Sequence, residues 1–182
     1  MGSAMRMRHV FPTRLGIFAL VWGEAGLSRL VLPERDEDAA RARLGGIEDG
    51  CPPDWVQQLV ASIVRYAGGE RVDFADAPVD FGQANQFDIA IWRTARTLGH
   101  GEVTTYGGLA LLAGHEGKAR AVGAALGRNP VPLVVPCHRI LAAGGRLGGF
   151  SAPGGNVTKA RLLMHERADT APALPGQQAF VF

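Results

Sequence analysis

The chain has 182 residues, 47% of them hydrophobic and 20% charged, a balance that supports a folded core and excludes a disordered chain. No window approaches about 18 consecutive apolar residues, and the N-terminus lacks the apolar run of a signal peptide, so we expect a cytoplasmic protein without membrane contact. The net charge of +2 divides unevenly, with −3 on residues 1–84 and +5 on residues 85–182. The second half is therefore either an ordinary solvated surface or a surface for a polyanionic partner.

The two cysteines, Cys51 and Cys137, lie 86 positions apart and form no CxxC motif. They cannot build a zinc site by themselves, and a disulfide scaffold is not expected in a reducing compartment. We therefore expect no metal site.

The first half alternates between strand and helix patterns. Residues 13–22 and 27–32 are apolar runs on either side of a Gly-containing turn, which predicts a β-hairpin. A short charged helix is expected over 36–44, and a longer amphipathic helix follows with Asp54 as its N-cap. Residues 72–81 are expected to be extended. This half is predicted to be a small α/β unit, and no catalytic residue is identifiable in it.

A boundary near residue 84 divides the chain into an N-terminal domain, 1–84, and a C-terminal domain with a tail, 85–182. The second domain begins with an amphipathic helix over 87–98. A second helix has Thr105 as its N-cap, and a third begins near Lys118 after a Gly-containing break. Two short helices around such a turn form a helix-turn-helix candidate.

The third helix, 118–128, has two different faces. Val122 and Leu126 form an inward apolar pair one turn apart. The opposite face holds a single arginine among small residues: Arg120, Gly123, Ala124 and Gly127. Each glycine costs about 1 kcal/mol of helix stability relative to alanine, so this face is expected to approach another surface closely. That surface is either a neighbouring helix or a DNA minor groove, which is only about 6 Å wide.

The apolar run 133–135 predicts a buried strand, which ends at a proline and presents Cys137 beside His138 and Arg139. Two adjacent side chains that can carry positive charge favour the thiolate, which is the nucleophilic form of cysteine. The Gly-rich residues 144–151 are expected to form a flexible wall around a pocket. The alternative is an unreactive cysteine packed in the core, the usual fate of a free cysteine.

The segment Pro136-Cys137-His138-Arg139-Ile140 resembles the active-site signature of the O6-alkylguanine-DNA alkyltransferases, also called methylated-DNA–protein-cysteine methyltransferases. The resemblance runs from Phe87 to Glu166, with looser similarity in the first half. Four further motifs and one dipeptide follow the family's order: Gly101–Tyr106, Ala119–Gly123, Asn129–Pro132, Phe150-Ser151 and Leu162–Glu166.

This resemblance implies a fold and an activity. The fold is an α/β N-terminal domain with a ribonuclease-H-like sheet, followed by a mainly α, helix-turn-helix (winged-helix-like) domain. The activity is DNA repair, in which the alkyl group of O6-alkylguanine, and in some cases O4-alkylthymine, moves irreversibly to the protein's own cysteine. Each molecule acts once, without a cofactor. The implied partner is double-stranded DNA with alkylated bases, bound through the minor groove by a monomer.

The resemblance also assigns roles to four reacting groups. Cys137 is the nucleophile, His138 is its water-bridged base, and Glu166 orients that histidine. Tyr106 helps to rotate the damaged nucleotide out of the duplex and can donate a proton to the departing guanine, which leaves more readily when protonated.

Further residues are implied in DNA binding and in support of the pocket. Arg120 is the finger that fills the vacated base stack. The residues expected to contact DNA around it are Ala119, Ala121, Gly123, Ala124 and Thr105. Those expected to line or support the pocket are Asn129, Ser151, Lys159 and Arg139. The chain departs from the family at Asp88, where many members have glutamine, and it lacks counterparts of the zinc ligands of some members.

Three other functions are compatible with parts of the pattern. A lesion-binding, alkyltransferase-like signalling protein would bind damage without repair, but such proteins replace the nucleophile that Cys137 supplies. A helix-turn-helix regulator would need side chains that read base edges, and the third helix has small residues there. A Cys-His hydrolase would turn over ester probes through an acyl-enzyme.

Overall fold

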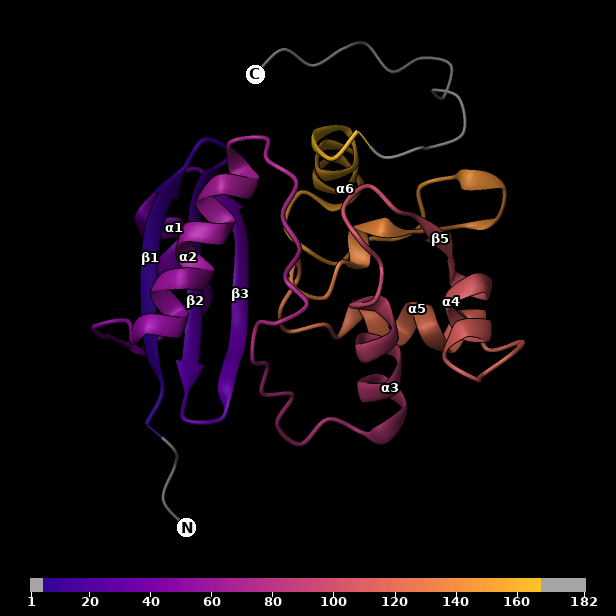
Figure 1. Cartoon of the computed structure of the whole chain (residues 1–182), viewed down its shortest axis with the longest axis horizontal. Coiled ribbons are helices and arrows are strands. Elements are labelled where there is room, and N and C mark those ends of the chain that lie inside the picture. The colour runs from indigo at the N-terminus through magenta and orange to yellow at the C-terminus, as the bar shows by residue number, and fades with distance from the viewer. Residues whose placement is uncertain (1–4, 168–182) are drawn as a thin grey trace.

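The computed structural model describes residues 5–167, so the Pro- and Ala-containing tail expected over 170–176 lies outside the described residues. The first half contains β1 (Met7–Thr13), β2 (Gly16–Gly23), β3 (Gly26–Glu34), α1 (Glu37–Leu44), β4 (Glu48–Asp49) and α2 (Asp54–Ala67). The second contains α3 (Gln86–Ala95), β5 (Thr104–Thr105), α4 (Tyr106–Leu112), α5 (Ala119–Gly127), the 3-10 turn η1 (Cys137–Arg139), β6 (Ile140–Leu141), η2 (Ala143–Gly145) and α6 (Gly155–His165). The chain is thus an α/β protein, with the larger sheet in its first half (Figure 1).

The larger sheet has the strand order β3-β2-β1-β4, with β1, β2 and β3 antiparallel and β4 parallel to β1. The predicted hairpin is confirmed as β2–β3. Strand β1 was not predicted, because its mixture of charged, aromatic and proline residues shows no clean alternation. Pro12 is tolerated there because β4 pairs only with Met7 and Arg8, and among the described residues no strand lies at the sheet edge beside Pro12.

The two helices of this half cover opposite faces of the sheet, which explains why β2 is apolar at consecutive positions. Phe18, Leu20 and Trp22 belong to the same buried cluster as the inner face of α2, whereas Ala19 and Val21 pack with α1. Successive side chains of a strand point to opposite faces, so a strand buried on both sides reads as a continuous apolar run.

Two predictions in this half need adjustment. Helix α2 begins at Asp54 itself, and Pro53 occupies the N-cap position. The segment 72–81, which was expected to be extended, contains a turn over 75–76 and a bend at 77, and its bridge pairs Val79 with Leu27. Its apolar residues Val72 and Phe74 are nonetheless buried against the core.

In the second half the three predicted helices are present. Thr105 caps α4 by accepting a hydrogen bond from the Gly108 amide at 3.0 Å, as expected. Helix α5 begins immediately after Lys118 and buries Val122 and Leu126, and α3 and α4 both pack against it.

The prediction of a strand over 133–135 was wrong. These residues are buried, but they form a turn in which Leu133 adopts a φ of 79°, with one bridge between Pro132 and Val135. Prolines before and after the run lack the amide hydrogen that a strand ladder requires, so burial here does not mean β-structure.

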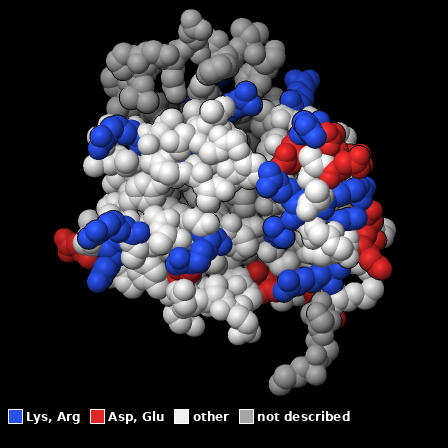
Figure 2. Space-filling view, turned by 180° about the vertical axis from the view of Figure 1, so that it is seen from behind, with Lys and Arg blue, Asp and Glu red and all other residues white. Residues whose placement is uncertain are grey.

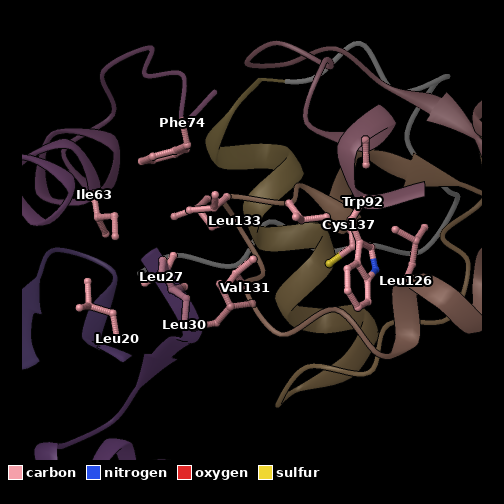
Figure 3. Close-up of a cluster of buried hydrophobic side chains, with 14 of the residues drawn as sticks. Leu20, Leu27, Leu30, Ile63, Phe74, Trp92, Leu126, Val131, Leu133 and Cys137 are labelled. Atoms are coloured by element: carbon pink, nitrogen blue, oxygen red, sulfur yellow. The ribbon is translucent and has the colours of Figure 1, made fainter. Parts of the chain in front are cut away.

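One hydrophobic cluster joins the two halves and reaches Cys137. Figure 3 shows Leu27 and Leu30 from β3 facing Val131 and Leu133, with Trp92, Leu126 and Cys137 further along the same cluster. The Leu30 amide also donates a hydrogen bond to the Pro130 carbonyl at 3.0 Å. The nucleophile candidate therefore lies against a core to which both halves contribute. Within residues 5–167, no helix is long and apolar enough to cross a membrane.

Candidate active site

A cavity of about 750 Å³ opens between α4, α5, η1 and the Gly-rich loop before α6. Seven of the predicted residues line it: Thr105, Tyr106, Ala119, Arg120, Gly123, Cys137 and Ser151. The parallel pairing of β5 with β6 holds the segment that carries Tyr106 beside the one that carries Cys137. The candidate nucleophile, the helices α4 and α5 and the glycine-rich wall thus meet at one opening.

Cys137 is 8% exposed, and Asn129 holds its sulfur in place. The Asn129 amide donates to Sγ at 3.3 Å and to the Val135 carbonyl at 2.9 Å, while its oxygen accepts from the Val131 amide at 3.0 Å. Asn129 therefore braces the turn that carries the cysteine.

Burial raises the pKa of the Cys137 thiol, and the smaller opposing effects of Asn129 and Lys159 do not cancel this. The expectation that the two following side chains favour the thiolate is not met. Both His138 and Arg139 turn toward Glu166 instead of the sulfur. The resting thiol is neutral, and it would need a base to act as a nucleophile.

His138 is fully buried and is the candidate for that base that the resemblance implies. Its Nε2 lies 2.8 Å from the Glu166 carboxylate, and its Nδ1 is buried without a hydrogen-bond partner among residues 5–167. Burial lowers the pKa of His138 more than Glu166 raises it, so the ring is neutral. Because a carboxylate only accepts, Nε2 carries the hydrogen and Nδ1 keeps a free lone pair, which is the arrangement of a base.

Glu166 is 4% exposed and accepts hydrogen bonds from four residues. Arg139 donates from Nε at 2.8 Å and from Nη2 at 2.9 Å, and the Gly101 amide donates at 3.1 Å. His138 is the third donor residue, and the Tyr66 hydroxyl is the fourth, at 2.9 Å. Burial alone would raise the pKa of Glu166, but the bonds from His138 and Arg139 hold it well below its usual range.

Sequence reasoning missed Tyr66, which lies 100 residues from Glu166 in the half where no functional residue was identified. Its position on the apolar face of α2, with Val56, Leu59 and Ile63, does indicate a buried hydroxyl that needs a partner. The sequence offers no indication of which residue that partner is.

Tyr106 forms one wall of the cavity. Its hydroxyl donates to the Gly149 carbonyl at 3.0 Å, and its ring lies so close to Gly148 that a Cβ atom there would come within 2.5 Å of it. Burial, followed by the proximity of Cys137, raises the pKa of the Tyr106 hydroxyl, which therefore remains a proton donor at neutral pH. Gly148 is required for this approach.

Lys159 and Ser151 each donate a hydrogen bond to a backbone carbonyl near the cavity. The Lys159 ammonium donates to the Ile140 carbonyl and lies 5.6 Å from the centre of the Tyr106 ring. Its burial lowers its pKa to about 8. The Ser151 hydroxyl donates to the Gly127 carbonyl at 3.1 Å, which ties the glycine-rich loop to α5.

The outer face of α5 is smooth and open. Arg120, Ala124 and Gly127 are exposed, whereas Ala119, Ala121 and Gly123 are partly buried. A Cβ atom on Gly127 would meet nothing within 4 Å, and one on Gly123 would make only an ordinary contact with Tyr106. Packing against a neighbouring helix therefore does not account for the glycines, among the residues that the structure describes.

The charges follow the asymmetry of the sequence. On the face drawn in Figure 2, acidic side chains gather mostly over the N-terminal half at the right, and the other half shows mainly basic ones around an uncharged centre. Asp88, the position at which the chain departs from the family, is bound by an arginine. Arg128, at the end of α5, donates two hydrogen bonds of 2.7 and 2.8 Å to its carboxylate.

Comparison with known proteins gives consistent similarities. Residues 86–168 match the family model described as the DNA-binding domain of 6-O-methylguanine DNA methyltransferase. The methylated-DNA–protein-cysteine methyltransferase of Mycolicibacterium paratuberculosis is 40% identical over 88% of this chain and 92% of that protein. The protein of the same name from Methanothermobacter thermautotrophicus is 33% identical over 81% and 77%.

Solved structures agree with the sequence similarities. The Mycobacterium tuberculosis O6-methylguanine methyltransferase aligns with a TM-score of 0.73 at 30% identity, covering 93% of this chain and 96% of that one. The complex of the Mycobacterium tuberculosis protein with DNA aligns with a TM-score of 0.71 at 30% identity, covering 89% and 94%.

Proposed function

The chain belongs to the methylated-DNA–protein-cysteine methyltransferase family, and we propose that it repairs duplex DNA by transferring the alkyl group of O6-alkylguanine to Cys137. The observation that carries this assignment is the position of the thiol, at a cavity lined jointly by the recognition helix α5 and by Tyr106. O4-alkylthymine is a second candidate substrate of the same chemistry.

The hydrogen bonds around Cys137 support a path for each proton. The free lone pair of His138 Nδ1 takes the thiol proton, through the bridging water that the resemblance implies, while Glu166 stabilises the resulting imidazolium. The thiolate attacks the alkyl carbon, the carbon–oxygen bond breaks, and its electron pair stays with the guanine. Tyr106 supplies a proton to the departing base. The thioether has no route back, so each molecule acts once.

The open face of α5 supports minor-groove binding, and we propose that the protein binds as a monomer. Small residues allow the backbone to approach a narrow groove, and Arg120 is the exposed cation at the rim of the cavity. Flipping the damaged nucleotide costs a few kcal/mol, which Arg120 would offset by filling the stack. We assign this work to a winged-helix-like domain, 85–167 within the described residues, and the preceding sheet to the ribonuclease-H-like type.

Intact mass spectrometry after incubation with a duplex containing O6-methylguanine tests the proposal. We expect a gain of one methylene per protein, located on the Cys137 peptide, and no further turnover. Cys137→Ser should bind the duplex and gain nothing, because an alcohol at neutral pH is a far poorer nucleophile than a thiolate. Tight binding without a mass gain in the wild type would instead indicate a signalling protein, and repeated methyl release would contradict single use.

A further inference from the structure

Tyr66 connects the N-terminal half to the hydrogen-bond network behind Cys137. It lies on α2, is fully buried, and donates its hydroxyl hydrogen to Glu166 Oε1 at 2.9 Å. Its ring packs against Phe74 and His165, and its backbone carbonyl lies 2.6 Å from the His165 Nε2 atom. Tyr66 is therefore fixed to the end of α6 at two points, and its hydroxyl has little freedom to leave Glu166.

The Glu166 oxygen that accepts the Tyr66 hydrogen bond also accepts the hydrogen bond of His138. Oε1 accepts from His138 Nε2 at 2.8 Å and from Arg139 Nη2 at 2.9 Å, whereas Oε2 serves Arg139 and Gly101. Donors on one carboxylate oxygen share its charge, so the Tyr66 hydroxyl weakens the attraction of Oε1 for the imidazole hydrogen. The same bond also fixes the direction of the carboxylate.

We propose that Tyr66 is a positioning residue for the alkyl-transfer reaction, acting from the N-terminal half through Glu166 to set how firmly the His138 ring is held and polarised. This inference rests on the proposed function. It gives the N-terminal half a part in the chemistry that is separate from DNA binding, because Tyr66 touches neither the thiol nor the cavity that Cys137 lines.

The charged groups around His138 determine the direction of the effect. Glu166 is the anion that contacts it, from the end of α6, while Arg139 on η1 and Lys159 on α6 both disfavour the imidazolium. His100, before β5, and His165, on α6, pack against the ring of Tyr66. Loss of the Tyr66 hydroxyl leaves Oε1 a stronger acceptor, so the imidazolium becomes easier to form.

The decisive variant is Tyr66→Phe, which keeps the ring and removes the bond. Single-turnover rates on free O6-benzylguanine, measured across pH, remove DNA binding from the comparison. We expect the midpoint of the rate–pH profile to move upward by about half to one pH unit, the size of one hydrogen bond expressed as a pKa. Titration of the His138 ring by NMR should move in the same direction.

Three comparisons separate this role from a loss of packing. Ile63→Val on the buried face of α2 disturbs the same helix without touching the network, and should leave the midpoint unchanged. Tyr66→Phe should add no shift in a Glu166→Gln background, because the path runs through that carboxylate. Site-specific 3-fluorotyrosine at position 66 keeps the hydroxyl and makes it a stronger donor, so the midpoint should move downward.

The outcomes are distinguishable. If the wild type never gains an alkyl group, the proposed function fails and takes this inference with it. If the wild type reacts and Tyr66→Phe has the wild-type midpoint, the inference alone is overturned. It is also overturned if Ile63→Val gives the same shift, or if the shift persists in the Glu166→Gln background.

Discussion

Replacing Glu166 by glutamine should be among the most costly single changes in this protein. The carboxylate is 4% exposed and faces Arg139, whose side chain is also buried. A glutamine can keep its oxygen toward Tyr66 and His138, but its NH₂ group then faces the Gly101 N–H and the Arg139 Nε–H, donor against donor. Breaking a buried ion pair from one side costs about 3–5 kcal/mol of unfolding free energy, and we expect a loss of that size.

Asp88→Asn is the matched control. Asp88 is also buried and bound twice by an arginine, but the Arg128 side chain is 56% exposed and can recover water when the charge is lost. We expect this variant to lose only about 1–2 kcal/mol. Urea unfolding at pH 7, followed by circular dichroism, measures both. Equal losses in the two variants would refute the argument from burial.

Acid should reduce the difference between wild type and Glu166→Gln. The pKa of Glu166 lies well below its usual range in the folded state, so its contribution to stability is complete above the unfolded value and is lost as pH falls toward the folded one. The gap in unfolding free energy should therefore be constant near neutral pH and narrow below about pH 4.3. Alkyl transfer by the variant should be slowed and not abolished, since His138 itself remains.

Three further predictions concern the DNA-facing side. Arg120→Ala should slow the repair of duplex DNA by roughly 5- to 150-fold, which is equivalent to about 1–3 kcal/mol of stacking. The single-turnover reaction with free O6-benzylguanine should be nearly unchanged. Equal losses on both substrates would instead place Arg120 in the pocket. Gly148→Ala should displace the Tyr106 ring and destabilise the protein by about 1–3 kcal/mol, measured by thermal unfolding, with slower transfer to free base as well. Binding to undamaged duplexes should weaken steeply with salt and vary little with sequence, and a strong operator preference in a binding assay would contradict this.

Local patterns were sufficient to predict the two faces of α5 and the N-cap of α4. The 3.6-residue spacing in α5 separates Val122 and Leu126 from Arg120 and Gly127, and the structure has the same two faces. The cap at Thr105 was predictable because a threonine preceding a helix satisfies amides that lack intrahelical partners. These features depend on residues close together in the chain.

Features that depend on distant segments were not predictable. The bond from Tyr66 to Glu166 spans 100 residues, and no pattern specifies which buried hydroxyl meets which carboxylate. The cationic neighbours of Cys137 predicted a thiolate, and this prediction failed. Adjacency in the sequence does not determine where the Arg139 side chain points, and in the structure it binds Glu166. Leu133 was placed in a strand because an apolar run shows burial, while the hydrogen-bond partners that decide between strand and turn come from the rest of the fold.

The raised pKa of Cys137 is consistent with a protein that is consumed by its own reaction. A resting thiolate would react with any electrophile that reached the cavity, and every such event would use up one molecule. Here burial raises the pKa of the thiol and lowers that of the imidazole, so both groups are neutral at rest. In the reaction that we propose, the reactive ion pair forms only when the proton moves to His138. The buried Glu166–Arg139 pair keeps the carboxylate charged behind the histidine, so it can stabilise the imidazolium at the moment it forms. In the proposed reaction, the negative charge that would stabilise the imidazolium is thus already in place on Glu166, hydrogen-bonded to His138.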